Sequence, residues 1–158
     1  MNNIFKTLSS LHGSWKGKGR GKFPTIDSFE YEEQLDFEVN STYPLIHYEQ
    51  RTVLLSTQEP SHWESGFIRV VDDNYIEISN SQDSGRVEVL RGKMLVISDS
   101  SYELNLASIS LGNDPRLKST KRLIKVSNNS IEYNKFMHTH TTKESKMLPH
   151  LSATLNKV

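Results

Sequence analysis

The sequence contains no cysteine, which excludes disulfides and thiolate metal sites and is compatible with a reducing compartment. No apolar run approaches the roughly 20 residues of a membrane-spanning helix, and the first residues lack the apolar segment of a signal peptide. We therefore expect a cytoplasmic protein without a membrane partner. Its 19 Lys and Arg are balanced by 19 Asp and Glu. Because nucleic-acid binders normally carry a basic excess, a nucleic-acid partner is not expected.

The common catalytic and nucleotide-binding motifs are also missing. There is no nucleophile elbow, dinucleotide fingerprint or HExxH sequence. The segment "GKGRGK" (17–22) superficially resembles a phosphate-binding loop. It lacks the Gly-Lys-Ser/Thr ending and the following helix of such a loop, so we discount that interpretation.

Residues 13–22 alternate strictly. Glycines and Trp15 occupy one face, and Ser, Lys and Arg occupy the other, which predicts a β-strand. Residues 29–39 alternate apolar and mostly acidic side chains, with Glu33 as an exception on the apolar face. If the two strands pair antiparallel, the basic outer face of the first meets the acidic outer face of the second. These charges would fix the register, since a one-residue slip would turn them inward.

The same alternation predicts an all-β fold. We expect about ten strands, at 13–22, 29–39, 44–55, 62–71, 75–81, 85–92, 93–98, 102–111, 119–126 and 130–140. Short turns and the lack of intervening helices favour a closed barrel or a sandwich, and residues 1–158 form one predicted domain. Short helices are predicted at residues 2–12, as a lid over one end, and at residues 147–158.

The glycine face of the first strand has three interpretations. Glycines can leave space inside a barrel, allow a sharp bend, or let another group approach the backbone. Small barrels of this strand number either fill their interior or hold one small ligand. The pattern indicates a barrel with a cavity for an apolar ligand.

Among the six histidines, His150 stands out. It follows Pro149 in the predicted C-terminal helix, between Leu148 and Leu151, and an imidazole fixed in apolar surroundings suits axial ligation of haem iron. His62 begins a strand at a predicted barrel rim, with Glu64 on the same face as a hydrogen-bonded partner or a fragment of a metal site. The pair His138 and His140 is predicted to face solvent, as at best an adventitious metal site.

Several segments together resemble the nitrobindin family of haem-binding β-barrels. The segments are "GSWKGKGRGKFPTI", "FEYEEQLDF", "LIHYEQRT", "PSHWESGFIR", "GRVEVLRG", "IEYNKFM" and "LPHLSATLNKV". They occur in the family's order over about residues 8–158. The resemblance implies a ten-stranded antiparallel up-and-down barrel, like those of fatty-acid-binding proteins and lipocalins.

The resemblance also implies a cofactor and an activity. Ferric haem b, one per subunit, would lie in a cleft at one end of the barrel, with His150 as the axial metal ligand. Thr25 and Lys118 match haem-contacting positions, and His62 matches a histidine near the cleft. The family binds nitric oxide and isomerises peroxynitrite to nitrate, with no catalytic residue beyond the haem iron. Whether the chain forms a homodimer is left open.

A second hypothesis is a haem-free intracellular carrier of a fatty acid or another small apolar ligand. The glycine face fits both hypotheses. His150 discriminates between them, because a lipid carrier has no need of an axial imidazole.

Overall fold

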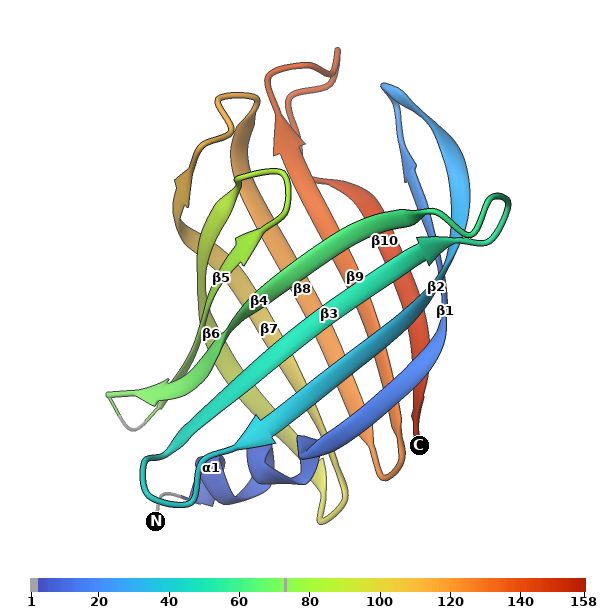
Figure 1. The fold of residues 1–158 in the computed structure, drawn as a ribbon. Coiled ribbons are helices and arrows are strands. Elements are labelled where there is room, and N and C mark those ends of the chain that lie inside the picture. The colour runs from blue at the N-terminus through green and yellow to red at the C-terminus, as the bar shows by residue number, and fades with distance from the viewer. Residues whose placement is uncertain (1–2, 73) are drawn as a thin grey trace.

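The computed structural model describes residues 3–72 and 74–158, which form a closed barrel of ten antiparallel strands (Figure 1). The strands are β1 (Gly13–Phe23), β2 (Ile26–Val39), β3 (Leu45–Leu54), β4 (Pro60–Val71), β5 (Tyr75–Gln82), β6 (Val87–Ser98), β7 (Ser101–Gly112), β8 (Leu117–Ser127), β9 (Ser130–Thr139) and β10 (Leu148–Lys157). Each strand pairs with the next along the chain, and pairing of β1 with β10 closes the barrel. The predicted all-β up-and-down barrel is therefore confirmed.

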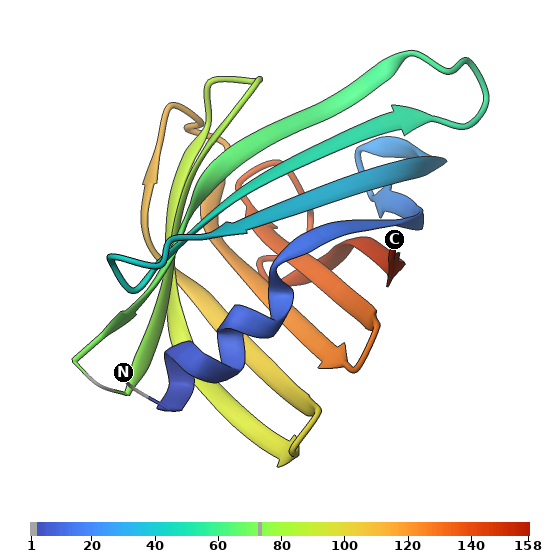
Figure 2. The same ribbon diagram turned by 60° about the horizontal axis from the view of Figure 1, so that its bottom comes forward.

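A short helix covers one end of the barrel. It consists of α1 (Asn3–Leu8) and the 3-10 turn η1 (Ser9–Leu11), which lie across that opening (Figure 2). Phe5, Leu8 and Leu11 are buried, and the indole Nε1–H of Trp15 donates to the Leu11 carbonyl at 2.8 Å. The predicted lid is confirmed from residue 3 onward, and its first residue lies outside the described residues. Within the described chain, no helix is long and apolar enough to cross a membrane.

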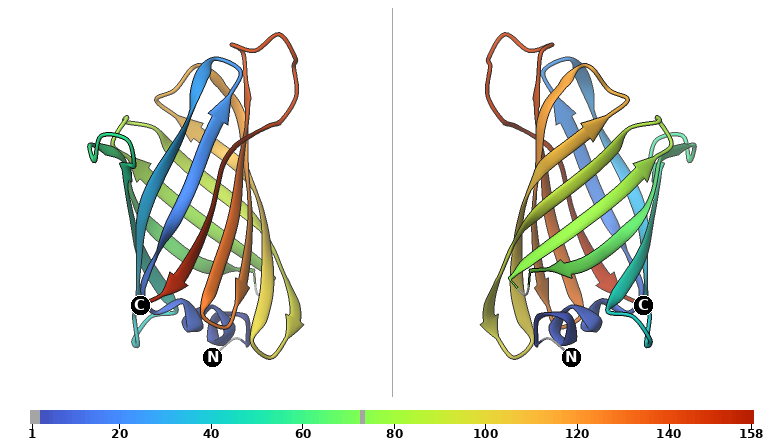
Figure 3. Two further views of the ribbon diagram at one scale, coloured as in Figure 1. Left: turned by 90° about the vertical axis from the view of Figure 1, so that its right-hand side faces the viewer. Right: turned by 90° about the vertical axis from the view of Figure 1, so that its left-hand side faces the viewer.

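The opposite end of the barrel is not covered by a helix. Figure 3 shows the loop of residues 140–147, between β9 and β10, standing above this end beside the β1–β2 hairpin. The β3–β4, β5–β6 and β7–β8 connections lie at the same end (Figure 1). We call it the open end.

The predicted pairing of the first two strands is confirmed. Lys18 faces Glu32, and Arg20 faces Glu30 across the β1–β2 ladder. Ser14 donates a hydrogen bond to Asp36 at 2.5 Å. The apolar faces of both strands point into the barrel. A register shift by one residue would turn this whole set of charges into the barrel, so the charges help to fix the register.

The glycines of β1 do not leave free space at Gly19 and Gly21. Gly19 pairs with Tyr31 and Gly21 with Phe29, and each aromatic ring lies directly over its glycine. A methyl group added at either glycine would overlap that ring. Of the three interpretations, close approach to the backbone is the one the structure supports here. The arrangement is a cross-strand covering of glycine by an aromatic side chain.

Replacing Gly19 with alanine is expected to lower the free energy of unfolding by about 1–3 kcal/mol, the usual cost of overpacking. Tyr31 has little freedom to move away, because it is buried and hydrogen-bonded to Tyr133 at 2.7 Å. Urea unfolding measures the change. On a Tyr31→Leu background, which removes the ring, the same substitution should cost less. Equal costs on both backgrounds would contradict the contact.

Two predicted elements are wrong, and their errors cancel in the strand count. Residues 85–92 and 93–98 were expected to form separate strands, but β6 runs continuously through Gly92, which pairs with Ile76 and Leu106. The predicted C-terminal helix is instead strand β10. Leu151 and Leu155 are spaced for a helix, yet both also fall on the period-two face that meets the glycines of β1. The pairing of β10 with both β1 and β9 decides between the two periods.

Candidate functional site

His150 occupies an irregular position in β10. Pro149 faces Phe136 and Leu151 faces Lys135 across the β9 ladder, so His150 is the extra residue of a β-bulge. The β1–β10 pairing reaches only to Leu151, so the missing N–H of Pro149 costs no ladder bond on that side. A bulge re-aims a side chain, and here it places the imidazole at the open end of the barrel.

The hydrogen bond of His150 fixes its tautomer. Nδ1 lies 3.1 Å from the carbonyl oxygen of Lys22, and because a carbonyl can only accept, Nδ1 carries the proton. Nε2 then keeps its lone pair. Burial lowers the pKa of His150, and the positive charges of Lys135 and Arg86 lower it further. The ring is therefore neutral at neutral pH, the form in which an imidazole binds a metal.

Two clefts meet at His150. The first, the outer cleft, has a volume of about 830 Å³ and the second, the inner cleft, about 350 Å³. The outer cleft is lined by Arg20, Gly21, Lys22, Ser28, Phe29, Glu30, Ser56, Asn134, Phe136, Pro149, His150, Leu151 and Ser152. The inner cleft is lined by Ser61, His62, Glu64, Gln82, Asp83, Ser84, Arg86, Glu88, Thr120, Arg122, Lys135, Phe136, Met137, His150 and Leu151. Both volumes fall in the range of small-molecule sites, roughly 300–1,000 Å³.

His62 lies in the inner cleft with His150. Its Nε2 is 3.2 Å from Oε1 of Glu64, and its Nδ1 is 3.7 Å from Oδ1 of Asp83. About a quarter of the His62 side chain is exposed, 26%, whereas Glu64 is 1% exposed. The predicted hydrogen-bonded pair of His62 and Glu64 is therefore present. Among the described residues, no group of three His, Cys, Asp or Glu side chains could hold a metal ion.

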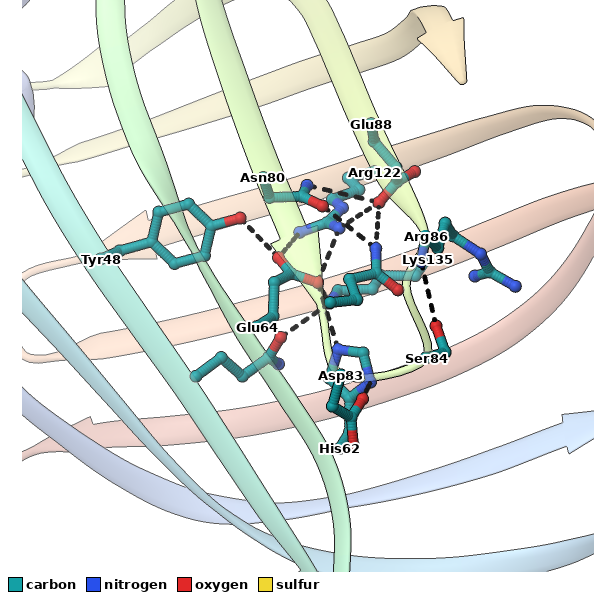
Figure 4. A network of polar contacts seen from close by, with 12 residues as sticks. Tyr48, His62, Glu64, Asn80, Asp83, Ser84, Arg86, Glu88, Arg122 and Lys135 are labelled. Carbon is teal, nitrogen blue, oxygen red and sulfur yellow. Dashed lines mark hydrogen bonds and ion pairs between the residues drawn. The ribbon is translucent and has the colours of Figure 1, made fainter. Parts of the chain in front are cut away.

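Charged and polar side chains form a network in the barrel interior (Figure 4), and Glu64, Glu88, Arg122 and Lys135 of this network line the inner cleft. We call this set the buried polar layer: Glu33, Tyr48, Gln50, Glu64, Glu88, Arg122, Tyr133 and Lys135. Arg122 links two carboxylates, with Nη1 2.8 Å from Glu64 and Nη2 2.6 Å from Glu88. Lys135 lies 3.8 Å from Glu64 and donates to Gln50 at 3.0 Å.

The carboxyl groups of this layer carry different charges. Burial on its own would raise the pKa of Glu64, but the charges of Arg122 and Lys135 outweigh it and hold that pKa well below its usual value. The pKa of Glu88 is lowered in the same way, since the charge of Arg122 outweighs the effect of burial. Burial dominates at Glu33 and raises its pKa. Glu64 and Glu88 therefore balance two cations, whereas the raised pKa of Glu33 keeps this group protonated up to a higher pH than usual.

Thr25 and Lys118 lie at the open end but outside both clefts. Thr25 is exposed in the turn between β1 and β2. Lys118 is exposed and donates to Ser145 of the β9–β10 loop at 3.2 Å. The hydroxyl of Ser145 also lies 3.1 Å from Nε2 of His138. The structure brings His62 and His150 to one cleft and leaves Thr25 and Lys118 at its periphery, and their haem contact stays a prediction.

The sequence reasoning missed the buried polar layer. Its one signal was Glu33, noted as an acidic residue on the apolar face of residues 29–39. Glu64 lies on the same face of β4 as the buried Ile68, and Arg122 on the same face of β8 as the buried Val126. The same test, a charged residue on an apolar face, would have found both.

These features define a class: a closed β-barrel that presents a neutral imidazole at an open cleft of small-molecule size. The family model described as "THAP4-like, heme-binding beta-barrel domain" matches residues 5–157. The chain belongs to this family, the nitrobindin family of haem-binding barrels.

Relatives and a solved structure agree with the family assignment. A protein of Arabidopsis thaliana named "Peroxynitrite isomerase Rv2717c" is 37% identical over 96% of this chain and 87% of its own length. A "Peroxynitrite isomerase" of Nocardia farcinica is 30% identical over 95% and 88%. The crystal structure of Rv2717c from M. tuberculosis superposes with a TM-score of 0.89, at 29% identity, covering 99% of this chain and 98% of that one.

Proposed function

We propose that this chain binds one ferric haem b beside His150 and isomerises peroxynitrite to nitrate, and that it binds nitric oxide. The hydrogen bond from Nδ1–H of His150 to the Lys22 carbonyl carries the proposal. Metal-ligating histidines almost always donate their second ring nitrogen in this way, which orients the ring and raises its basicity.

The residues at the cleft fit a haem group. The Nε2 lone pair of His150 is available as the axial ligand, and the edge of the ring packs against Phe23 at 5.7 Å between ring centroids. Phe29, Leu151 and Met137 supply apolar wall around the clefts. The two clefts share Phe136, His150 and Leu151, and in the proposal the haem would lie at the imidazole against these side chains.

The activity would need little acid–base help from the protein. Peroxynitrite and nitrate contain the same atoms and charge, so the conversion consumes no net proton or electron. When bound, ferric haem would supply a Lewis-acidic iron for the peroxo oxygen. The chain itself would hold the axial imidazole, and Arg86 and Lys135 line the inner cleft together with His150.

Hemin titration followed by stopped flow tests the proposal. The Soret band is expected to saturate at one hemin per chain. The decay rate of peroxynitrite should then rise in proportion to the concentration of the haem-loaded protein, with nitrate as the product. The haem-free protein is the control. An unsaturable Soret change, or equal decay rates with and without haem, would overturn the proposal.

The alternative function, a haem-free carrier of a fatty acid, has less support. The buried polar layer crosses the barrel interior where an acyl chain would run (Figure 4). A lipid carrier also gives no reason for the oriented imidazole of His150.

A further inference from the structure

A further space, in addition to the outer and inner clefts, lies on the α1 side of the buried polar layer. We call it the apolar cavity. It is lined by Leu11, Leu35, Phe37, Ile68, Ile78, Leu104, Ile124, Val126 and Ile131, with Tyr48, Gln50, Arg122, Tyr133 and Lys135 of the polar layer. The space open to the centre of a water-sized sphere is about 50 Å³, several times the roughly 10–15 Å³ that one water needs.

The polar side chains in the wall of this cavity are occupied elsewhere. The Tyr48 hydroxyl donates to Glu64 at 2.5 Å, and the Tyr133 hydroxyl donates to Glu33 at 2.5 Å. Lys135 donates to Gln50 at 3.0 Å. Both terminal nitrogens of Arg122 bind carboxylates within the layer.

A water molecule in the cavity would therefore have few hydrogen-bonding partners, because nine of the fourteen lining side chains are apolar and the polar ones are hydrogen-bonded within the layer. A buried water typically makes about three hydrogen bonds, and cavities lined by Leu, Ile and Phe stay dry and take apolar guests instead. An empty cavity also forfeits dispersion contacts of its lining atoms, which a guest restores. Charged and strongly polar guests are excluded by the cost of their desolvation.

We propose that the apolar cavity is a binding site for a small uncharged apolar molecule in the size range of a diatomic gas. Arg122 and Lys135 line both this cavity and the inner cleft. The guest would thus lie one layer of side chains beneath the floor of the inner cleft. The proposal does not depend on haem binding, because every residue that carries it lies in the barrel interior.

Xenon is a suitable probe, since it is apolar and of similar size. Methyl NMR spectra of the haem-free full chain, recorded under increasing xenon pressure, should show saturable shifts at Ile78, Leu104, Val126 and Ile131. The same spectra serve as a check on the fold. Shifts that rise linearly without saturation, or that are confined to methyl groups of the clefts, would overturn the proposal.

Variants of the cavity wall sharpen the test. Leu104→Phe places a larger side chain in the cavity wall and should abolish the saturable shifts. Val126→Ile is a smaller change that should weaken them, and it serves as the test if Leu104→Phe does not fold. Ile46→Val is the matched control, because Ile46 is fully buried but does not line the cavity. Xenon binding that persists in both filled variants, or that is lost in Ile46→Val, would contradict this location.

Discussion

Replacing His150 with alanine is expected to weaken hemin binding by more than about 100-fold and to abolish the acceleration of peroxynitrite decay. Removing a mere hydrogen-bonding partner of a metal ligand typically costs 10–100-fold in affinity, so removing the ligand itself should cost more. The imidazole also shapes the wall shared by both clefts. Soret titration measures the affinity, and stopped flow measures the rate.

Two controls separate ligation from a general loss of structure. His12→Ala changes an exposed histidine at the covered end of the barrel and should leave hemin binding unchanged. Added imidazole should restore a Soret band typical of histidine ligation in His150→Ala, because the substitution leaves a space where the His150 ring was. Unchanged hemin affinity in His150→Ala would contradict the assignment of the axial ligand.

The sequence analysis assigned His150 to a helix, whereas the structure places it in strand β10. Leu148, Leu151 and Leu155 fit a helical period, and the bulge at His150 breaks the period of two that would have revealed the strand. A bulge changes which face each following residue occupies, so parity alone could not place the imidazole. By contrast, β1 and β2 contain no irregularity between Ser14 and Gly21, and their predicted register holds over that stretch.

The buried polar layer was harder to predict for a different reason. Arg122 and Glu64 are 58 residues apart in the chain, and Arg122 and Glu88 are 34 apart. Glu64, Glu88 and Arg122 lie on β4, β6 and β8, no two of which are neighbours in the sheet. Only the curvature of the closed barrel brings their side chains into contact. A single strand shows such a residue as an isolated exception in its apolar face, without its partners.

Replacing Glu64 with glutamine should be the most destabilising change in this layer, by about 3–5 kcal/mol, the typical cost of breaking a buried ion pair from one side. The amide would leave Arg122 with one carboxylate, and it would remove the charge near Lys135. The free energy of unfolding, measured in urea at pH 7, gives the effect. A loss below about 1 kcal/mol would show that the ion pair is not formed.

The difference between the parent protein and Glu64→Gln should also depend on pH in a fixed direction. The pKa of Glu64 is lowered from a usual value of 4.5 by Arg122 and Lys135, which outweigh its burial. Its stabilising contribution is therefore complete above that usual value and is lost as pH falls through the lowered one. The difference in unfolding free energy should shrink below about pH 4.5.

Glu33→Gln is the matched comparison, because it makes the same change in the same layer and predicts the opposite slope. Burial raises the pKa of Glu33, so its contribution is complete below the usual value of 4.5 and is lost as pH rises through the raised one. The glutamine amide oxygen can still accept from Gln50, but its NH2 group cannot accept from the Tyr133 hydroxyl, which donates to Glu33 in the parent protein, so the variant loses one hydrogen bond, at a cost of about 1 kcal/mol. The variant should gain stability relative to the parent protein as pH rises. Slopes of the same sign for the two variants would contradict the opposite directions of the two pKa shifts, because a lowered pKa and a raised pKa change the stability with pH in opposite directions.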